Sequence, residues 1–241
     1  MRDFLIYGVN NSSFRDIILY KHPILNNHIL NSLLMKIFNT LSGNSELVLR
    51  LPNYFGFLLF FIAIWKVFKD IGKKFFLIFG ILFLISNLYL LDFFSLARGY
   101  GLGVGLSMMS FALLYRYFLT KRSNKLLLWL VLAFSALSVY ANFSFTSFHL
   151  TVCLILLALI IKRIANKAIY GKIYTHLLPF FVVNTVLVAL TIVPIIKLKQ
   201  IDALSFGSTS GIVEGTIKSL VSSGLYIPQN NTLVNAITLF V

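Results

Sequence analysis

The chain has 241 residues, of which 59% are hydrophobic and only 12% are charged, and its mean hydropathy is +0.89. Soluble globular domains contain about 45–50% apolar and about 25% charged residues, so this composition excludes a soluble enzyme and indicates a membrane protein. The 21 lysines and arginines outnumber the 7 acidic residues and give a net charge of +14, which raises the question of a nucleic-acid partner. The single cysteine, Cys153, excludes an intrachain disulfide.

Apolar segments of the length that a bilayer requires recur along the chain. A helix needs roughly 20 mainly apolar residues to cross the hydrocarbon core, and six segments approach this length: 51–68, 75–91, 100–119, 126–141, 144–161 and 177–196. A seventh apolar run begins at about residue 232. The expected fold class is therefore all-α, a polytopic transmembrane bundle over residues 51–200, followed in 201–241 by an outer loop and the start of a truncated span.

Basic residues collect in the segments that follow the first, third and fifth of these spans. These alternate segments hold 12 of the 21 basic residues and a single acid, Asp70. Loops rich in lysine and arginine stay in the cytoplasm, so membrane topology accounts for most of the net charge and no nucleic-acid partner is needed. The abundance of Phe, Ile, Asn and Lys is typical of an AT-rich bacterial gene, and we expect a multi-pass protein of the bacterial inner membrane.

The same topology makes residues 1–50 the first extracytoplasmic loop, although no signal segment precedes them. We therefore expect a missing N-terminal span, and the apolar run cut off at Val241 leads us to expect that the chain is a fragment. Within this loop, residues 24–42 place apolar side chains at helical spacing and predict an amphipathic helix in the membrane interface. This helix either roofs a lipid-facing cavity or simply packs on the bundle.

Polar groups gather on the outer side of this topology. Ionisable residues within or at the rim of a membrane are unfavourable in free energy, so they tend to mark functional sites. Arginine and lysine bind phosphate through charge-assisted hydrogen bonds, so an anionic ligand is one interpretation and ordinary solvated loop charge is the other. The glycines at 99, 101, 103 and 105 follow no strand, so they predict close helix packing rather than a dinucleotide-binding loop. His22 and His28 are six residues apart, which does not suit one helical face, and His149 and His176 lie on different spans, so a metal site is a minor alternative.

Three segments in a fixed order carry a resemblance to a known family. They are HPILNNHILN at residues 22–31, GNSELVLRLPN at 43–53 and LARGY at 96–100. With these motifs the chain resembles the polytopic GT-C glycosyltransferases, and within them the branch of bacterial lipid A aminoarabinose transferases and protein O-mannosyltransferase-like enzymes. The resemblance covers residues 1–200, which correspond to the N-terminal membrane module of that family.

The resemblance implies an inverting hexosyl- or pentosyltransferase that moves a sugar from a polyprenyl-phosphate carrier to a lipid, glycan or protein acceptor on the extracytoplasmic face. It implies no cofactor and leaves the use of a divalent metal open. The general base of the family is an acid in the first outer loop, which corresponds here to Asp3, with Asp16 as the fallback. Many members carry two adjacent acids at this point, whereas Asp3 stands between Arg2 and Phe4.

The remaining site residues follow from the chemistry that a lipid-phosphate leaving group requires. Cations can neutralise the charge that develops on the phosphate, and we expect the carrier or substrate to be bound by Arg98, Lys197, Arg50, His28 and Asn27. The competing interpretation is a polytopic transporter or a flippase for lipid-linked sugars. Charges at the outer rim and the lack of an internal repeat favour the enzyme, because transporters usually place ionisable groups near the midplane.

Overall fold

The computed structural model describes residues 11–21, 28–43, 45–71, 74–95, 99–120, 124–166 and 173–200, with short stretches at 217–218, 221–222, 227–228, 232 and 234–235. Within these residues every regular element is a helix and none is a strand, which confirms the all-α prediction. In chain order the elements are α2 (Phe14–Ile18), α3 (Ile29–Ser42), α4 (Glu46–Ile71), α5 (Lys74–Ile85), α6 (Leu88–Ser95), α7 (Tyr100–Leu119), α8 (Lys125–Ala141), the 3-10 helix η1 (Phe143–Phe145), α9 (Thr146–Ala165) and α10 (Ile173–Gln200).

Four helical segments among the described residues are long and apolar enough to cross a membrane: Glu46–Lys69, Tyr100–Leu119, Phe143–Ala165 and Ile173–Gln200. The apolar helix α8 is shorter, with 17 residues. Only 22% of the apolar window is buried in Phe143–Ala165 and in Ile173–Gln200. A soluble protein rarely exposes apolar surface on this scale, so these helices indicate an integral membrane protein.

The predicted second span, 75–91, is wrong as a single helix. The helix α5 ends at Ile85, and α6 begins at Leu88 after a break in which the Asn87 side chain accepts a hydrogen bond from the backbone N–H of Leu90. The 12 residues of α5 extend about 18 Å at 1.5 Å per residue, which is less than the roughly 30 Å of hydrocarbon in a bilayer. The structure therefore replaces the expected second span with two short helices, and α6 packs on α4 and α7.

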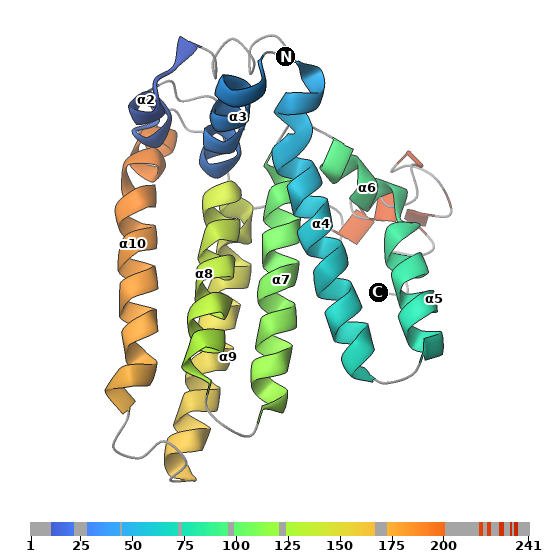
Figure 1. The fold of residues 1–241 in the computed structure, drawn as a ribbon, viewed down its shortest axis with the longest axis vertical. Coiled ribbons are helices and arrows are strands. Elements are labelled where there is room, and N and C mark those ends of the chain that lie inside the picture. The colour runs from blue at the N-terminus through green and yellow to red at the C-terminus, as the bar shows by residue number, and fades with distance from the viewer. Residues whose placement is uncertain are drawn as a thin grey trace.

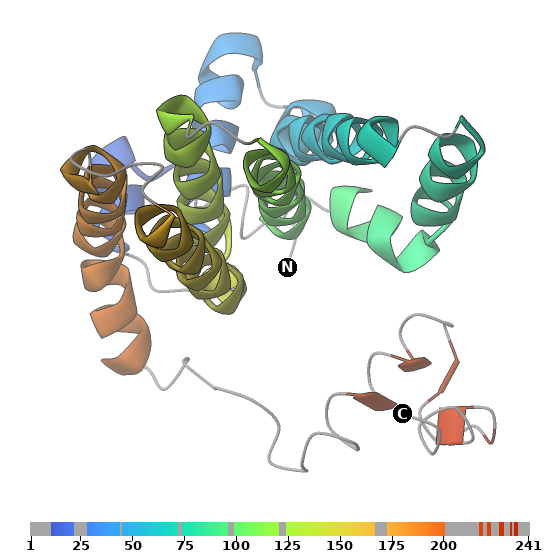
Figure 2. The same ribbon diagram turned by 90° about the horizontal axis from the view of Figure 1, so that it is seen from below.

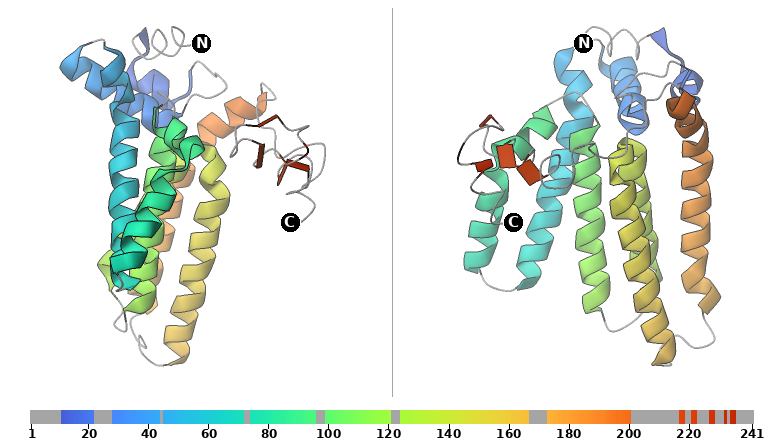
Figure 3. Two further views of the ribbon diagram at one scale, coloured as in Figure 1. Left: turned by 90° about the vertical axis from the view of Figure 1, so that its right-hand side faces the viewer. Right: turned by 180° about the vertical axis from the view of Figure 1, so that it is seen from behind.

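The long helices alternate in direction. Figure 1 shows α4, α7 and α9 running away from the end that carries α2 and α3, while α5, α8 and α10 run back towards it. Six basic residues near the helix termini consequently lie at the opposite end, which we call the basic end: Lys66, Lys69, Arg116, Lys125, Lys162 and Arg163. The end that carries α2 and α3 is called the loop end, and both are visible from two further sides in Figure 3.

The helix α7 lies between α4 and α8, as Figure 2 shows from below. Its contact with α4 depends on glycine, because a Cβ added at Gly105 would overlap the carbonyl of Gly56, and one added at Gly56 would lie 2.6 Å from the carbonyl oxygen of Gly101. The prediction that these glycines permit close helix packing is confirmed for Gly101 and Gly105. The backbones of α4 and α7 thus hold the centre of the bundle at close distance.

The predicted amphipathic helix is present as α3, Ile29–Ser42, and residues 24–27 of the prediction lie outside the described residues. It buries Ile29, Asn31, Ser32 and Met35, and it packs on α4 and α8. Packing of this helix on the bundle is therefore observed, and a role as the roof of a lipid-facing cavity stays a prediction.

Candidate functional site

The three sequence segments that carry the family resemblance meet at the loop end. His28 is the residue before α3, Asn53 lies in the second turn of α4, and Tyr100 is the first residue of α7. The rings of His28 and Tyr100 are in edge-to-face contact with their centroids 4.9 Å apart. We call this meeting point of α3, α4 and α7 the polar junction.

One carboxamide connects the three helices. The side chain of Asn53 is fully buried; its Nδ2 donates to Oδ1 of Asn31 on α3 at 3.2 Å, and its Oδ1 accepts from the backbone N–H of Leu102 on α7 at 3.0 Å. These partners are 22 and 49 residues away in sequence. A buried polar group is expected to be hydrogen-bonded, and here the bonds join segments that are far apart in the chain.

The end of α8 also reaches the polar junction. A Cβ added at Gly99 would overlap the carbonyl oxygen of Ala141 and lie 2.5 Å from Cβ of His28. The next residue, Asn142, is buried, and its Oδ1 accepts a hydrogen bond of 2.9 Å from the N–H of Ser144. Its Nδ2 has no partner. A buried donor of this kind can bind a ligand oxygen or a water molecule.

Asp16, the fallback base, is used to cap α2. Its carboxylate accepts hydrogen bonds from the hydroxyl and the backbone N–H of Ser13, at 2.8 and 3.1 Å, and it pairs with Lys21 at 3.4 Å. The hydrogen bonds from Ser13 lower the pKa of Asp16 below its ordinary value. An acid stabilised in its ionised form is a weaker base, so this geometry favours a structural role for Asp16.

Lys197, at the C-terminal end of α10, caps the same short helix from the other side. Its Nζ donates to the carbonyl oxygens of Leu19 and Tyr20, at 2.7 and 3.1 Å. Tyr20 adopts a left-handed backbone with φ of 51°, and burial raises the pKa of its hydroxyl to about 12. An ammonium group has three donors, so these two bonds leave one N–H of Lys197 for another partner.

The other predicted residues divide into two groups. Arg50 forms an ion pair of 2.6 Å with Glu46 on the exposed side of α4, and of the predicted set only His28 is observed at the polar junction. Asp3, Asn27 and Arg98 lie outside the described residues. Nothing therefore tests Asp3 as the base or Arg98 as a phosphate ligand.

A second polar network lies inside the spans, and the sequence interpretation missed it. The imidazole of His149 on α9 contacts Ser135 Oγ on α8 at 2.8 Å through Nδ1, and Asn184 Oδ1 on α10 at 3.1 Å through Nε2. Cys153 Sγ lies 3.7 Å from the same Nε2. The sequence did contain an indication of this network. Ser135, His149 and Asn184 stand inside apolar spans, where a polar side chain is unfavourable in free energy and tends to mark a site. In the part of the chain that the structure describes, no three His, Cys, Asp or Glu side chains form a metal-binding group.

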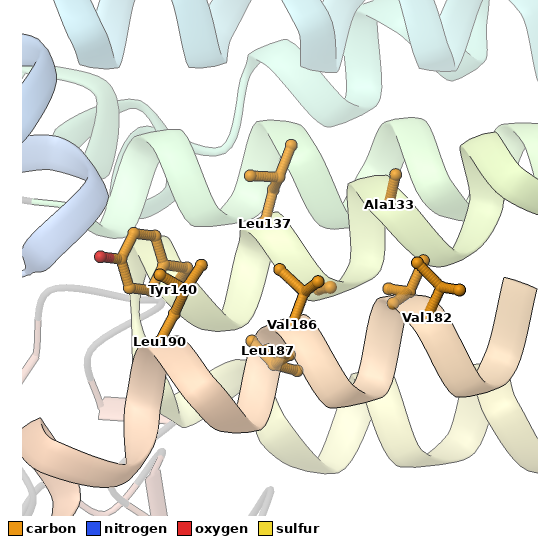
Figure 4. Close-up of a pocket in the computed structure, with 9 residues that line it drawn as sticks. Ala133, Leu137, Tyr140, Val182, Val186, Leu187 and Leu190 are labelled. Carbon is orange, nitrogen blue, oxygen red and sulfur yellow. The ribbon is translucent and has the colours of Figure 1, made fainter.

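An apolar groove of about 260 Å³ runs between α8 and α10 (Figure 4). Its lining contains no polar surface and includes side chains exposed on the outside of the bundle, such as Val186. At one end Tyr140 and Leu190 face each other across the groove (Figure 4). Tyr140 also belongs to a buried cluster with Ile17, Tyr20, Ile29 and Leu198, so this end of the groove adjoins the helices of the loop end. The full lining is Ala133, Ala136, Leu137, Tyr140, Val182, Val183, Val186, Leu187 and Leu190.

Comparison with known proteins assigns no family. No family model matches the chain, and no curated protein or solved structure has significant similarity to it.

Proposed function

We propose that the protein is a membrane glycosyltransferase that moves a sugar from a polyprenyl-phosphate carrier to an acceptor on the extracytoplasmic face of a bacterial inner membrane. The observation that carries the proposal is the convergence of the three resemblance segments: His28 and Asn31, Asn53, and Gly99 with Tyr100 meet in one polar junction. This junction lies at the loop end, which the positive-inside rule places away from the cytoplasm.

The groove between α8 and α10 supports the same proposal, because it is suited to the isoprenoid chain of the carrier. Its lining is apolar, and Leu137, Val182, Val186 and Leu190 are exposed on the outside of the bundle, where lipid would surround it. Lys197 follows Leu190 by seven residues, which is about 10 Å along α10. A carrier chain in the groove would therefore place its phosphate within reach of a cation at the membrane surface.

The proposed transfer needs little covalent chemistry from the protein. The acceptor oxygen attacks the anomeric carbon from the face opposite the phosphate, the bond from that carbon to the phosphate oxygen breaks, and the phosphate leaves on its lipid. A carboxylate takes the proton of the acceptor hydroxyl, and cations stabilise the departing phosphate. We assign the first role to Asp3 and the second to Arg98, with Lys197 as a further cation.

The test uses the protein in proteoliposomes with a radiolabelled polyprenyl-phosphate sugar and a membrane extract as the source of acceptor. We expect transfer of label to an acceptor, and Asp3→Asn should lower the rate by about 100-fold or more. Asp16→Asn is the matched control, which should retain transfer because Asp16 caps α2. Sugar transfer by Asp3→Asn at the wild-type rate would exclude Asp3 as the base. If the wild-type protein transfers no sugar, the proposed function is overturned.

A lipid-linked-sugar flippase or other transporter is the second candidate, favoured by one observation. His149 is buried within the spans and joins α8, α9 and α10 through Ser135 and Asn184, and ionisable residues inside membranes often mark transport pathways. The same proteoliposomes separate the two candidates. Label that crosses the bilayer but stays on its carrier identifies the flippase.

A further inference from the structure

We propose that Asn53 is a positioning residue, which holds the interfacial helix α3 in register against the first turn of α7. The proposal rests on the proposed function, because the group it positions is the polar junction. It assigns Asn53 no contact with the reacting atoms. Its action is exerted through Asn31 on one side and through the backbone of Leu102 on the other.

The carboxamide of Asn53 both donates and accepts a hydrogen bond. Its Oδ1 accepts from the N–H of Leu102 at 3.0 Å, and its Nδ2 donates to Asn31 Oδ1 at 3.2 Å. Asn31 continues the chain of bonds within α3, where its Nδ2 contacts Met35 Sδ at 3.0 Å. A carboxamide side chain supplies a donor and an acceptor from one planar group. An apolar residue of similar volume would fill the same space without making either bond.

The helices around Asn53 have little freedom to shift without breaking these bonds. A Cβ added at Gly101 would lie 2.9 Å from Asn53 Oδ1, so the backbone of α7 is in direct contact with this side chain. A Cβ added at Gly99 would lie 2.5 Å from Cβ of His28. Asn31 is three residues from His28, and Leu102 is two residues from Tyr100. The bonds through Asn53 therefore hold the two helix ends that carry the His28 and Tyr100 rings in a fixed relation.

Directionality separates this contact from the apolar packing around it. Hydrophobic contact is not directional, so packing alone allows α3 to slide or rotate on the bundle. A buried polar pair penalises every other register, because a shifted helix leaves a donor and an acceptor unpaired. Hydrogen bonds between membrane helices contribute only modest stability on average. Loss of the Asn53 bonds should therefore release α3 while the bundle stays folded.

The experiment compares Asn53→Leu with Asn53→Asp. Asn53→Leu removes both bonds at similar volume, whereas Asn53→Asp in its neutral form keeps both, because its carbonyl oxygen accepts from Leu102 and its hydroxyl donates to Asn31 Oδ1. We expect Asn53→Leu to lower kcat of sugar transfer about 10- to 100-fold, as misplacement of a reactive group does, while KM for the carrier changes less than about threefold. Asn53→Asp should recover most of the kcat that Asn53→Leu loses.

A second readout follows the position of α3 without using activity. In a Cys153→Ser background, Ser32→Cys reports on α3 and Ser138→Cys reports on α8, since both serines are buried. We expect Asn53→Leu to accelerate maleimide labelling at position 32 at least about tenfold, as local opening exposes a protected site. Labelling at position 138 should stay slow, because the bonds of Asn53 go to α3 and α7, and Ser138 is held by a bond to Ser135 within α8.

Each outcome decides the proposal. Unchanged kcat per folded molecule together with unchanged labelling at position 32 would overturn it. If Asn53→Leu does not fold, Asn31→Leu replaces it, because that variant removes the link to α3 and keeps the Leu102 bond; the same two readouts then apply. If the wild type transfers no sugar, the proposed function fails, and labelling at position 32 alone decides whether Asn53 positions α3.

Discussion

The two ends of the bundle use their cations in the same way. At the basic end, Arg163 donates to the carbonyl oxygens of Tyr117 and Thr120, at 3.0 and 2.9 Å, and its guanidinium lies 4.3 Å from the centre of the Tyr117 ring. At the loop end, Lys197 donates to the carbonyls that follow α2. Both cations stabilise the C-terminus of a helix, where the dipole is negative. Each of these two cations therefore has a structural partner that does not depend on a ligand.

The ends differ in their neutral polar side chains. The loop end buries Asn31, Asn53 and Asn142, and the first two join helices that are far apart in sequence. At the basic end, the principal link between helices in the described part of the chain is the charged side chain of Arg163. Burying an amide carries a cost unless its bonds are made, so a linked group of buried amides is a stronger indication of a specific site than surface charge.

The largest predicted effect concerns the contact between α4 and α7, two helices that run from the loop end to the basic end. Gly105→Ala should lower the free energy of unfolding by about 3 kcal/mol, the upper range for overpacking, because its Cβ would overlap the backbone of Gly56. Gly103→Ala is the control and should lose much less, since its Cβ would meet the ring of Phe145, a side chain that can move. Thermal unfolding in detergent measures both. Equal losses would show that backbone contact does not limit this packing.

The sequence predicted the helical elements well where periodicity and length were decisive. The alternating basic segments predicted the directions of the long helices, and the glycines after Arg98 predicted the close contact of α7. The broken second span was missed because its mean hydropathy is high, although Ser86 and Asn87 supplied a helix-cap signal within the described residues.

The site was harder to predict, because its contacts are non-local. Nothing in the sequence near Lys197 shows that its partner is a carbonyl 178 residues earlier. Asn53 reads as an ordinary residue after Pro52, and its role depends on partners that only the fold brings together. From the sequence, His149 counted only as a candidate metal ligand on a different span from His176, whereas its observed partners are Ser135 and Asn184 on two other helices.

The next prediction tests the assignment of Arg163 to structure alone. Arg163→Ala should destabilise the protein by about 2 kcal/mol, from the lost charge at the C-terminus of α7 and the lost cation–π contact. Arg163→Lys should recover part of this loss. Sugar transfer per folded molecule should be unchanged, measured beside thermal unfolding. A fall in transfer without a fall in stability would mean that the basic end takes part in function.

Lys197 should give a smaller, local effect. Lys197→Gln removes the charge at the end of α2 and should weaken the docking of α2 by about 1 kcal/mol, seen as faster proteolysis within Phe14–Ile18. Lys199→Gln is the matched control, because Lys199 is exposed two residues further along α10. If Lys197 also binds the carrier phosphate, KM for the carrier rises in Lys197→Gln and stays unchanged in Lys199→Gln. An unchanged KM in both restricts Lys197 to capping.

The smallest predicted effect is the pH dependence of α2. Hydrogen bonds from Ser13 lower the pKa of Asp16 below its ordinary value of 3.8. A depressed pKa means that the folded state favours the ionised form, so the capping contribution is complete above pH 3.8 and declines as the pH falls through the folded-state pKa. Pepsin is active in this range, and cleavage near Phe14 and Leu19 should accelerate as the pH falls, relative to cleavage elsewhere in the chain. Asp16→Asn should abolish this additional acceleration, and Ser13→Ala should move it to higher pH. Acceleration that persists unchanged in Asp16→Asn would assign the acid sensitivity of the loop end to another group.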